Sequence, residues 1–284
     1  NDAIVGQPTP SYYVRTADNN VYVCIRQGKD SFGAAVVSQT QPDHTNTSLP
    51  IETDGYIWKY MYTITTADAN KFLTSNFMPV KFVDSAAPTA PEAPQKAVQD
   101  ASVVGQMIGY RFDAGNAVYS SAPTLTVRGD GSSAKAHAIL DAANKIAAVE
   151  IGDSAQVGTT GFPSINSQMG SGFNQAYVKV DQTNLTSGTN AKVYPIIAPD
   201  NGIGADMRTD LRSNSIMFNI KPEGSVDGTW VVDNEYRQIG LLKNLLDSSN
   251  GNLFTETQGT AAKKLVMTTR ITGGLNWADD VTVN

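Results

Sequence analysis

The chain has 284 residues and a mass of 30.3 kDa, enough to bury one or two hydrophobic cores without disulfides or metals. Charged residues are only 17% of the sequence and the net charge is −6 without a basic run, so no nucleic-acid partner is expected. One cysteine and two histidines leave no disulfide framework and little for a metal site, so we expect no cofactor and no metal. No apolar run approaches the ~20 residues that span a bilayer, and no membrane partner is expected.

Alternation of apolar side chains with a period of two dominates the first part of the chain. Residues 11–15 and 20–25 are expected to form strands. At 54–64 an Asp-Gly turn dipeptide is followed by four aromatic residues at every second position, namely Tyr56, Trp58, Tyr60 and Tyr62. In a strand these rings share one face, whereas a helix would scatter them around its circumference. We predict that they form the interior of a β-layer, where large aromatic side chains supply much of the packing energy.

A short helix and an edge strand are predicted next. Residues 66–73 fit a helix that begins at a threonine N-cap and carries Asp68 in its first turn, where negative charge suits the helix dipole. Residues 77–82 are expected to form a strand at a sheet edge, because Pro79 has no N–H to donate to a ladder.

The rest of the chain alternates short strands with glycine-rich turns. Three prolines at every third position of 86–94 indicate an extended, polyproline-like connector. The predicted fold is mainly β: a layered β-sandwich with a few short α-helices in end loops, plus a small all-β middle module. The expected domains are 1–85, the N-terminal part of the sandwich body; 86–94, the Pro-rich connector; 95–182, the small Gly-rich β module; and 183–284, the C-terminal part that completes the body.

Motifs that would carry catalysis are missing from the sequence. No nucleophile elbow, zinc-protease, phosphate-loop or dinucleotide fingerprint occurs. Residues 202–204, Gly-Ile-Gly before a possible helix, could offer N–H groups to an anion, but an ordinary turn is the simpler interpretation. Cys24 is expected to be a small core residue, and neither His44 nor His137 is assigned a role. We therefore predict a protein that is not an enzyme, with no catalytic, cofactor-binding or metal residues.

Several stretches resemble the gene-product-8 family, a baseplate wedge subunit of contractile-tailed bacteriophages. The resemblance covers about residues 10–82 and 193–275, and its most specific part is 54–64. The middle block, 95–182, carries no signature of that family. Residues that belong to similar stretches, and are candidates for the structural core or an interface, are Tyr56, Trp58, Tyr60, Tyr62, Tyr236 and Arg237.

The resemblance implies a function without catalysis. A member of this family would be a homodimer that joins other baseplate wedge proteins in the virion tail, after assembly in the host cytoplasm. Two alternatives remain open at this stage. One is a glycan- or receptor-binding β module of a tail fibre or spike, which would use exposed aromatics such as Tyr56 or Trp58, or the Gly-rich turns of 120–175. The other is a β-rich hydrolase with two carboxyl groups ~5–9.5 Å apart in a cleft.

Overall fold

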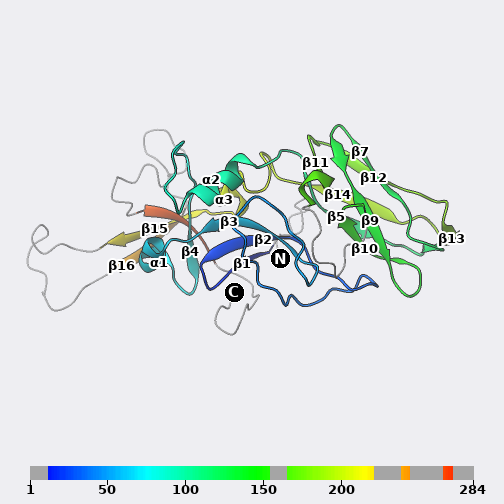
Figure 1. Cartoon of the computed structure of the whole chain (residues 1–284), viewed down its shortest axis with the longest axis horizontal. Coiled ribbons are helices and arrows are strands. Elements are labelled where there is room, and N and C mark those ends of the chain that lie inside the picture. Colours follow the sequence, from blue (N-terminus) through cyan, green and yellow to red (C-terminus); the bar gives the residue numbers. More distant parts are fainter. Residues whose placement is uncertain (1–11, 154–164, 221–237, 244–264, 271–284) are drawn as a thin grey trace, which may run out of the picture. The chain divides into compact units, whose positions relative to one another are not determined.

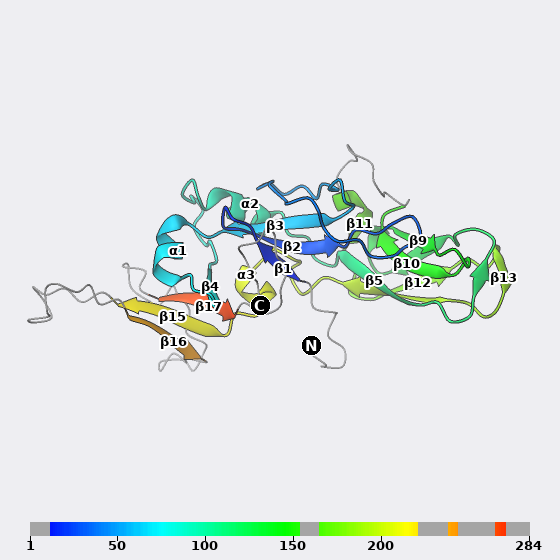
Figure 2. The same cartoon turned by 90° about the horizontal axis from the view of Figure 1, so that it is seen from below.

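The computed structural model describes residues 12–153, 165–220, 238–243 and 265–270. The chain is mainly β, with several antiparallel sheets and a few short helices, so the predicted β-sandwich-like class is confirmed (Figures 1 and 2). The strands are β1 (Tyr13–Arg15), β2 (Asn20–Arg26), β3 (Ile57–Thr63), β4 (Phe77–Val80), β5 (Met107–Asp113), β6 (Val118–Tyr119), β7 (Leu125–Gly129), β8 (Ser132–Ala134), β9 (Ala136–Leu140), β10 (Ile146–Ile151), β11 (Met169–Ser171), β12 (Ala176–Val180), β13 (Leu185–Ser187), β14 (Lys192–Ile197), β15 (Ser215–Ile220), β16 (Gln238–Lys243) and β17 (Leu265–Arg270). The helices are α1 (Thr66–Phe72), α2 (Ala93–Asp100), the 3-10 turn η1 (Ile165–Gln168) and α3 (Met207–Asp210).

The chain folds into two compact units, each of which consists of segments that are separated in the sequence. The first comprises Asn1–Thr16, Val21–Met61 and Ala97–Ala205. The second comprises Ala17–Asn20, Tyr62–Lys96 and Asp206–Asn284.

The middle of the first unit is built from two small antiparallel sheets. One has the strand order β10-β9-β7-β12, and the other pairs β14 with β5. β12 also lies against β14, and β10 against β5, so the two sheets adjoin at both of their edges (Figure 1). The expected domains assign residues 192–197 to the 183–284 part of the body, whereas these residues form β14 and pair in register with β5 of the middle block, Lys192 opposite Asp113. The expected domain boundary at 182 therefore falls between β12 and β14, which belong to adjoining sheets of the same unit.

The three-stranded sheet β1-β2-β3 holds the aromatic core. β2 and β3 are buried on both faces, so their apolar residues run almost without interruption. On β3, Ile57 and Met61 are fully buried on the side opposite the aromatic row. The sheet therefore lies inside the protein, as predicted for residues 20–25 and 54–64, and both of its faces contribute to the core.

The second unit contains helix α1 and the sheet β16-β15-β17-β4 (Figure 2). β4 lies at the end of this sheet, which is the position that Pro79 permits and the sequence predicted. α1 begins at the N-cap Thr65, whose side chain accepts a hydrogen bond from the N–H of Asp68. Phe72 of α1 packs on Met217 of β15, and this contact joins the helix to the sheet.

The proline-rich segment differs from the expected extended connector. A turn at 89–92 leads into helix α2, which begins at Ala93. The Glu92 carboxylate accepts hydrogen bonds from the N–H and the hydroxyl of Thr89, at 3.1 and 2.7 Å, in the manner of a capping box. Proline is compatible with a helix start because the first N–H groups have no intrahelical acceptor. The spacing of the prolines was therefore a misleading signal, and the Thr-x-x-Glu pattern was the informative one.

Candidate functional site

The aromatic row is interior packing. Its members are all 3% exposed or less: Tyr56, Trp58, Tyr60 and Tyr62. The rings of Tyr56 and Trp58 stack with centroids 5.6 Å apart, and Tyr12 meets the same indole edge-on at 5.7 Å. Such aromatic pairs add about 0.5–1.5 kcal/mol to the burial of their surface. Because the rings are covered by protein, they offer no platform for a sugar. Tyr56 and Trp58 are therefore not available for the glycan-binding alternative.

Tyrosine hydroxyls of this core hold the surrounding loops. Tyr22 donates a hydrogen bond to the backbone carbonyl of His44 at 3.0 Å, and Tyr56 donates to that of Val36 at 2.7 Å. A buried tyrosine needs a partner for its hydroxyl, and here the partners are main-chain atoms far away in the sequence. Tyr22 of β2 and Tyr56 of the row therefore fix the backbone of the segment between β2 and β3 at His44 and Val36.

A buried ion pair joins β2 to β10. Arg26 Nη1 lies 3.4 Å from Glu150 Oε2, and the two side chains are 6% and 3% exposed. Arg26 Nε and Nη2 donate to the carbonyl of Gly55, at 3.2 and 3.0 Å. Burial lowers the pKa of Arg26 and raises the pKa of Glu150, while the charge of each partner opposes the shift of the other. No local sequence pattern predicts this pair, because no spacing rule brings residues 26 and 150 together.

Asp54 ties the loop before the aromatic row to a neighbouring turn. Its Oδ2 accepts hydrogen bonds from the Ser38 hydroxyl and the Gln39 N–H, both at 2.7 Å, and from the Thr40 N–H at 2.9 Å. Burial by itself raises the pKa of Asp54, but these donors outweigh it and hold the pKa below its usual value. The Asp-Gly turn expected here is present, and the carboxylate of Asp54 fixes the neighbouring turn at 38–40 through these hydrogen bonds.

Glu52 is the nearest candidate for acid–base chemistry. Burial raises its pKa to about 7, and the charges of Asp43 and Asp54 add to the effect. A carboxyl group with such a pKa could exchange a proton near neutral pH. Within the described part of the chain, however, no group of three histidine, cysteine or acidic residues is placed to hold a metal ion.

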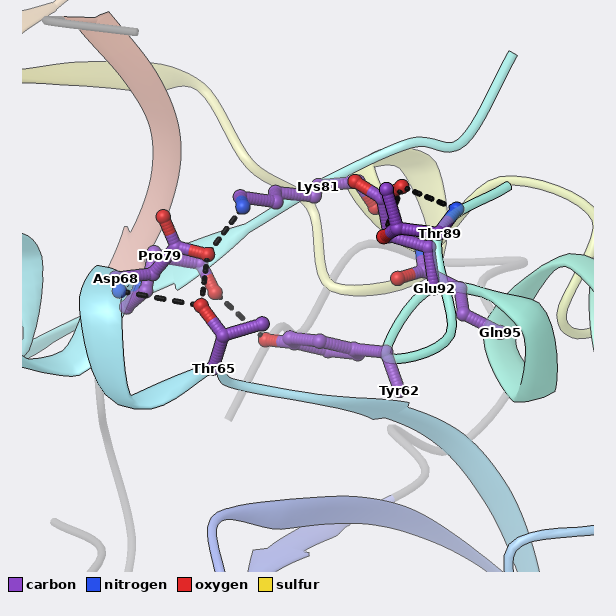
Figure 3. Close-up of polar contacts among 8 residues, drawn as sticks. All are labelled: Tyr62, Thr65, Asp68, Pro79, Lys81, Thr89, Glu92 and Gln95. Atoms are coloured by element: carbon purple, nitrogen blue, oxygen red, sulfur yellow. Dashed lines mark hydrogen bonds and ion pairs between the residues drawn. The ribbon is translucent and has the colours of Figure 1, made fainter. Parts of the chain in front are cut away.

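Polar contacts in the second unit link α1 to the residue that follows β4, and the end of β3 to β4 (Figure 3). Asp68 accepts a hydrogen bond from the Thr65 hydroxyl at 2.6 Å and forms an ion pair with the Lys81 ammonium. Tyr62 donates to the carbonyl of Pro79 at 2.9 Å. Each of these polar groups has a hydrogen-bond or ion-pair partner, so the cluster stabilises the local structure.

Burial favours the uncharged forms of the cysteine and of the two histidines. Burial raises the pKa of Cys24 to about 12, which keeps the thiol protonated at neutral pH. Burial also lowers the pKa of His44 and of His137, so both imidazoles are neutral there.

The Gly-Ile-Gly turn serves packing. Gly202 has a φ of +85°, and a Cβ atom there would lie 2.4 Å from the carbonyl oxygen of Val103. Lys59 donates to the carbonyl of Ile203 at 2.6 Å, which fixes the turn from the other side. The helix that follows, α3, has four residues. The simpler interpretation, an ordinary turn, fits these contacts.

Large apolar side chains that the described residues leave exposed are Phe32, Val37, Val104, Tyr177 and Tyr194. Among the candidates from the sequence, Tyr236 and Arg237 lie outside the described residues. No described helix is long and apolar enough to cross a membrane.

Comparison with protein families, curated proteins and solved structures finds no match for this chain.

Proposed function

We propose that the protein is a structural subunit of a contractile phage tail, a baseplate wedge component that acts through interfaces with its neighbours. The observation that carries the proposal is the burial of the aromatic row in the 54–64 segment, where the resemblance to the wedge family is most specific. A row used wholly for packing supports a protein whose work is to hold a shape. The low fraction of charged residues, 17%, also suits large protein–protein contacts, whose cores are depleted in charge.

A rigid loop supports the same proposal. Asp30 Oδ1 accepts hydrogen bonds from the N–H groups of Phe32 and Ala34, both at 2.9 Å. On this loop the side chain of Phe32 is 56% exposed, and Val37 nearby is 76% exposed. Apolar side chains on a preorganised loop lose little entropy when a partner covers them. We propose that a second copy of the chain covers this loop in a homodimer, and that other wedge proteins bind elsewhere.

Light scattering on purified protein tests the dimer. We expect a mass of twice 30.3 kDa at micromolar concentration. The double substitution Phe32→Ser and Val37→Ser should shift the mass toward the monomer, whereas Val104→Ser, at another exposed apolar position, should leave it unchanged. A wild-type monomer at that concentration contradicts the dimer, and a dimer that survives the double substitution contradicts the assignment of the loop.

Mass spectrometry of purified tails tests the assembly role. We expect the protein in the baseplate fraction after the tail is dissociated, in a fixed ratio to the other wedge proteins. If it is absent from purified tails, the baseplate proposal fails even where the dimer holds.

A further inference from the structure

Four strands of the middle sheets form one outward face. β7 pairs with β12, and β14 pairs with β5. Cα atoms of β12 and β14 lie within 8 Å of each other, closer than the ~10 Å between sheets stacked face to face. The two strands therefore lie side by side, and the outward surfaces of the two sheets are continuous across them.

This face combines aromatic and basic side chains. Residues that pair directly across antiparallel strands point to the same side, as do residues two apart on one strand. Tyr177 is opposite Arg128, and Tyr194 is opposite Arg111. All the outward residues of interest are exposed: Arg111, Arg128, Tyr177, Lys179, Lys192 and Tyr194. Residues of the opposite side, such as Val180 and Val193, are buried.

The charge of the face is opposite to that of the chain. Four basic residues lie on it, and the acidic residue within these four strands is Asp113, which is opposite Lys192. The whole chain carries −6. The Arg111 guanidinium lies over the Tyr194 ring, 5.4 Å from its centroid, so this pair presents charge and ring together. Tyr177 is 60% exposed.

We propose that this face, defined as the outward surface of β7, β12, β14 and β5, binds an acidic polysaccharide whose sugar rings carry carboxylates. Guanidinium groups match carboxylates in a planar, two-pronged geometry. A tyrosine ring can cover the apolar C–H face of a sugar while its hydroxyl stays in water. The tyrosines lie on the two inner strands, β12 and β14, and the arginines on the two outer strands, β7 and β5, so the rings that could stack on sugars have a cation for a carboxylate on either side.

The composition of the face favours a polysaccharide over a protein or a nucleic acid as the partner. A protein interface of comparable size has a dry apolar core, but the large apolar side chains exposed on these strands are the two tyrosines. A nucleic acid carries closely spaced charge and is usually bound by basic domains, which a chain of pI 4.9 does not resemble. The proposal is independent of the baseplate role.

Electrophoresis of the full chain through gels that contain polygalacturonate tests the proposal. We expect retardation that neutral dextran does not cause, with weaker retardation by polyglutamate and by oligothymidylate. Tyr177→Ala and Tyr194→Ala should each weaken the affinity for polygalacturonate about tenfold, and Arg128→Gln should weaken it and reduce its salt dependence. Val104→Ala and Lys71→Gln, which remove exposed apolar surface and an exposed charge elsewhere, should change nothing.

Several outcomes would overturn the proposal. Absence of retardation by polygalacturonate would do so. Equal retardation by polyglutamate or oligothymidylate would show general polyanion binding or a different class of ligand. Equal losses in the face and control variants would place binding elsewhere. Circular dichroism melts of every variant guard against unfolding, and because the substituted side chains are exposed, we expect melting temperatures close to that of the wild type.

Discussion

Loss of either partner of the buried Arg26–Glu150 pair should destabilise the protein, whereas replacement of both partners together should cost little stability. At 3.4 Å and an effective dielectric constant of about 20, the attraction is about 5 kcal/mol. Removal of one partner leaves a buried charge without its counterion, which typically costs about 3–5 kcal/mol. We expect Arg26→Met to cost more than Glu150→Gln, because it also takes the two side-chain donors from the carbonyl of Gly55.

Replacement of both residues should recover most of the lost stability. In Arg26→Met combined with Glu150→Leu, no charge remains buried and apolar side chains fill the space. We expect this double variant to lie within ~2 kcal/mol of the wild type, whereas Glu150→Gln alone should lower the melting temperature by roughly 6–20 °C.

Urea and thermal unfolding of the wild type, Arg26→Met, Glu150→Leu and the double variant, followed by circular dichroism, supply the four corners of the double-mutant cycle, and Glu150→Gln is measured beside them. Because the pair lies within the first compact unit, the comparison should use the transition that reports that unit. If the losses of the single variants simply add in the double variant, or if Glu150→Gln costs nothing, the reasoning about this pair is refuted.

Three further predictions concern single residues. Glu52→Gln should stabilise the protein at pH 8 and leave it unchanged at pH 4, because burial raises the pKa of Glu52 to about 7 and stability is therefore lost as pH rises from about 4.5 through 7; melting temperatures across that range check this. Gly202→Ala should cost more than the ~1 kcal/mol of an ordinary left-handed glycine, because the new Cβ meets the Val103 carbonyl at 2.4 Å, and urea unfolding measures it. Cys24 should react with iodoacetamide at pH 8 at least about a hundredfold more slowly than a free thiol, because burial raises its pKa to about 12; mass spectrometry follows the single cysteine.

Each of these predictions has a clear contrary result. A pH dependence that is the same in the Glu52 variant as in the wild type would mean that this carboxyl group keeps its ordinary pKa. A Gly202 variant as stable as the wild type would show that the turn can move away from Val103. Cys24 is only partly exposed, and rapid alkylation in the folded protein would contradict the desolvation that raises the pKa of its thiol.

Local pattern was sufficient for much of the fold. The aromatic alternation predicted β3, the threonine and Asp68 predicted the start of α1, and the proline predicted that β4 lies at an edge. These features depend on side-chain periodicity, capping and a missing N–H, which act over a few residues.

Pairing over long distances could be found only in the tertiary structure. β14 with its internal Pro195 showed no clear strand pattern, yet it pairs with β5, about 80 residues earlier in the chain. The outward tyrosine–arginine face arises from the same pairings, because no single strand carries enough of it to form a visible motif.

By itself, the sequence determined that the protein is mainly β and that the row at 56–62 belongs to its interior. The tertiary structure decided that both sides of β3 are covered and that Arg26 finds Glu150. It also decided that aromatic and basic side chains meet on one surface. The physical reason is that periodicity records which side of an element avoids water, whereas the partner on that side is chosen by the packing of the whole chain.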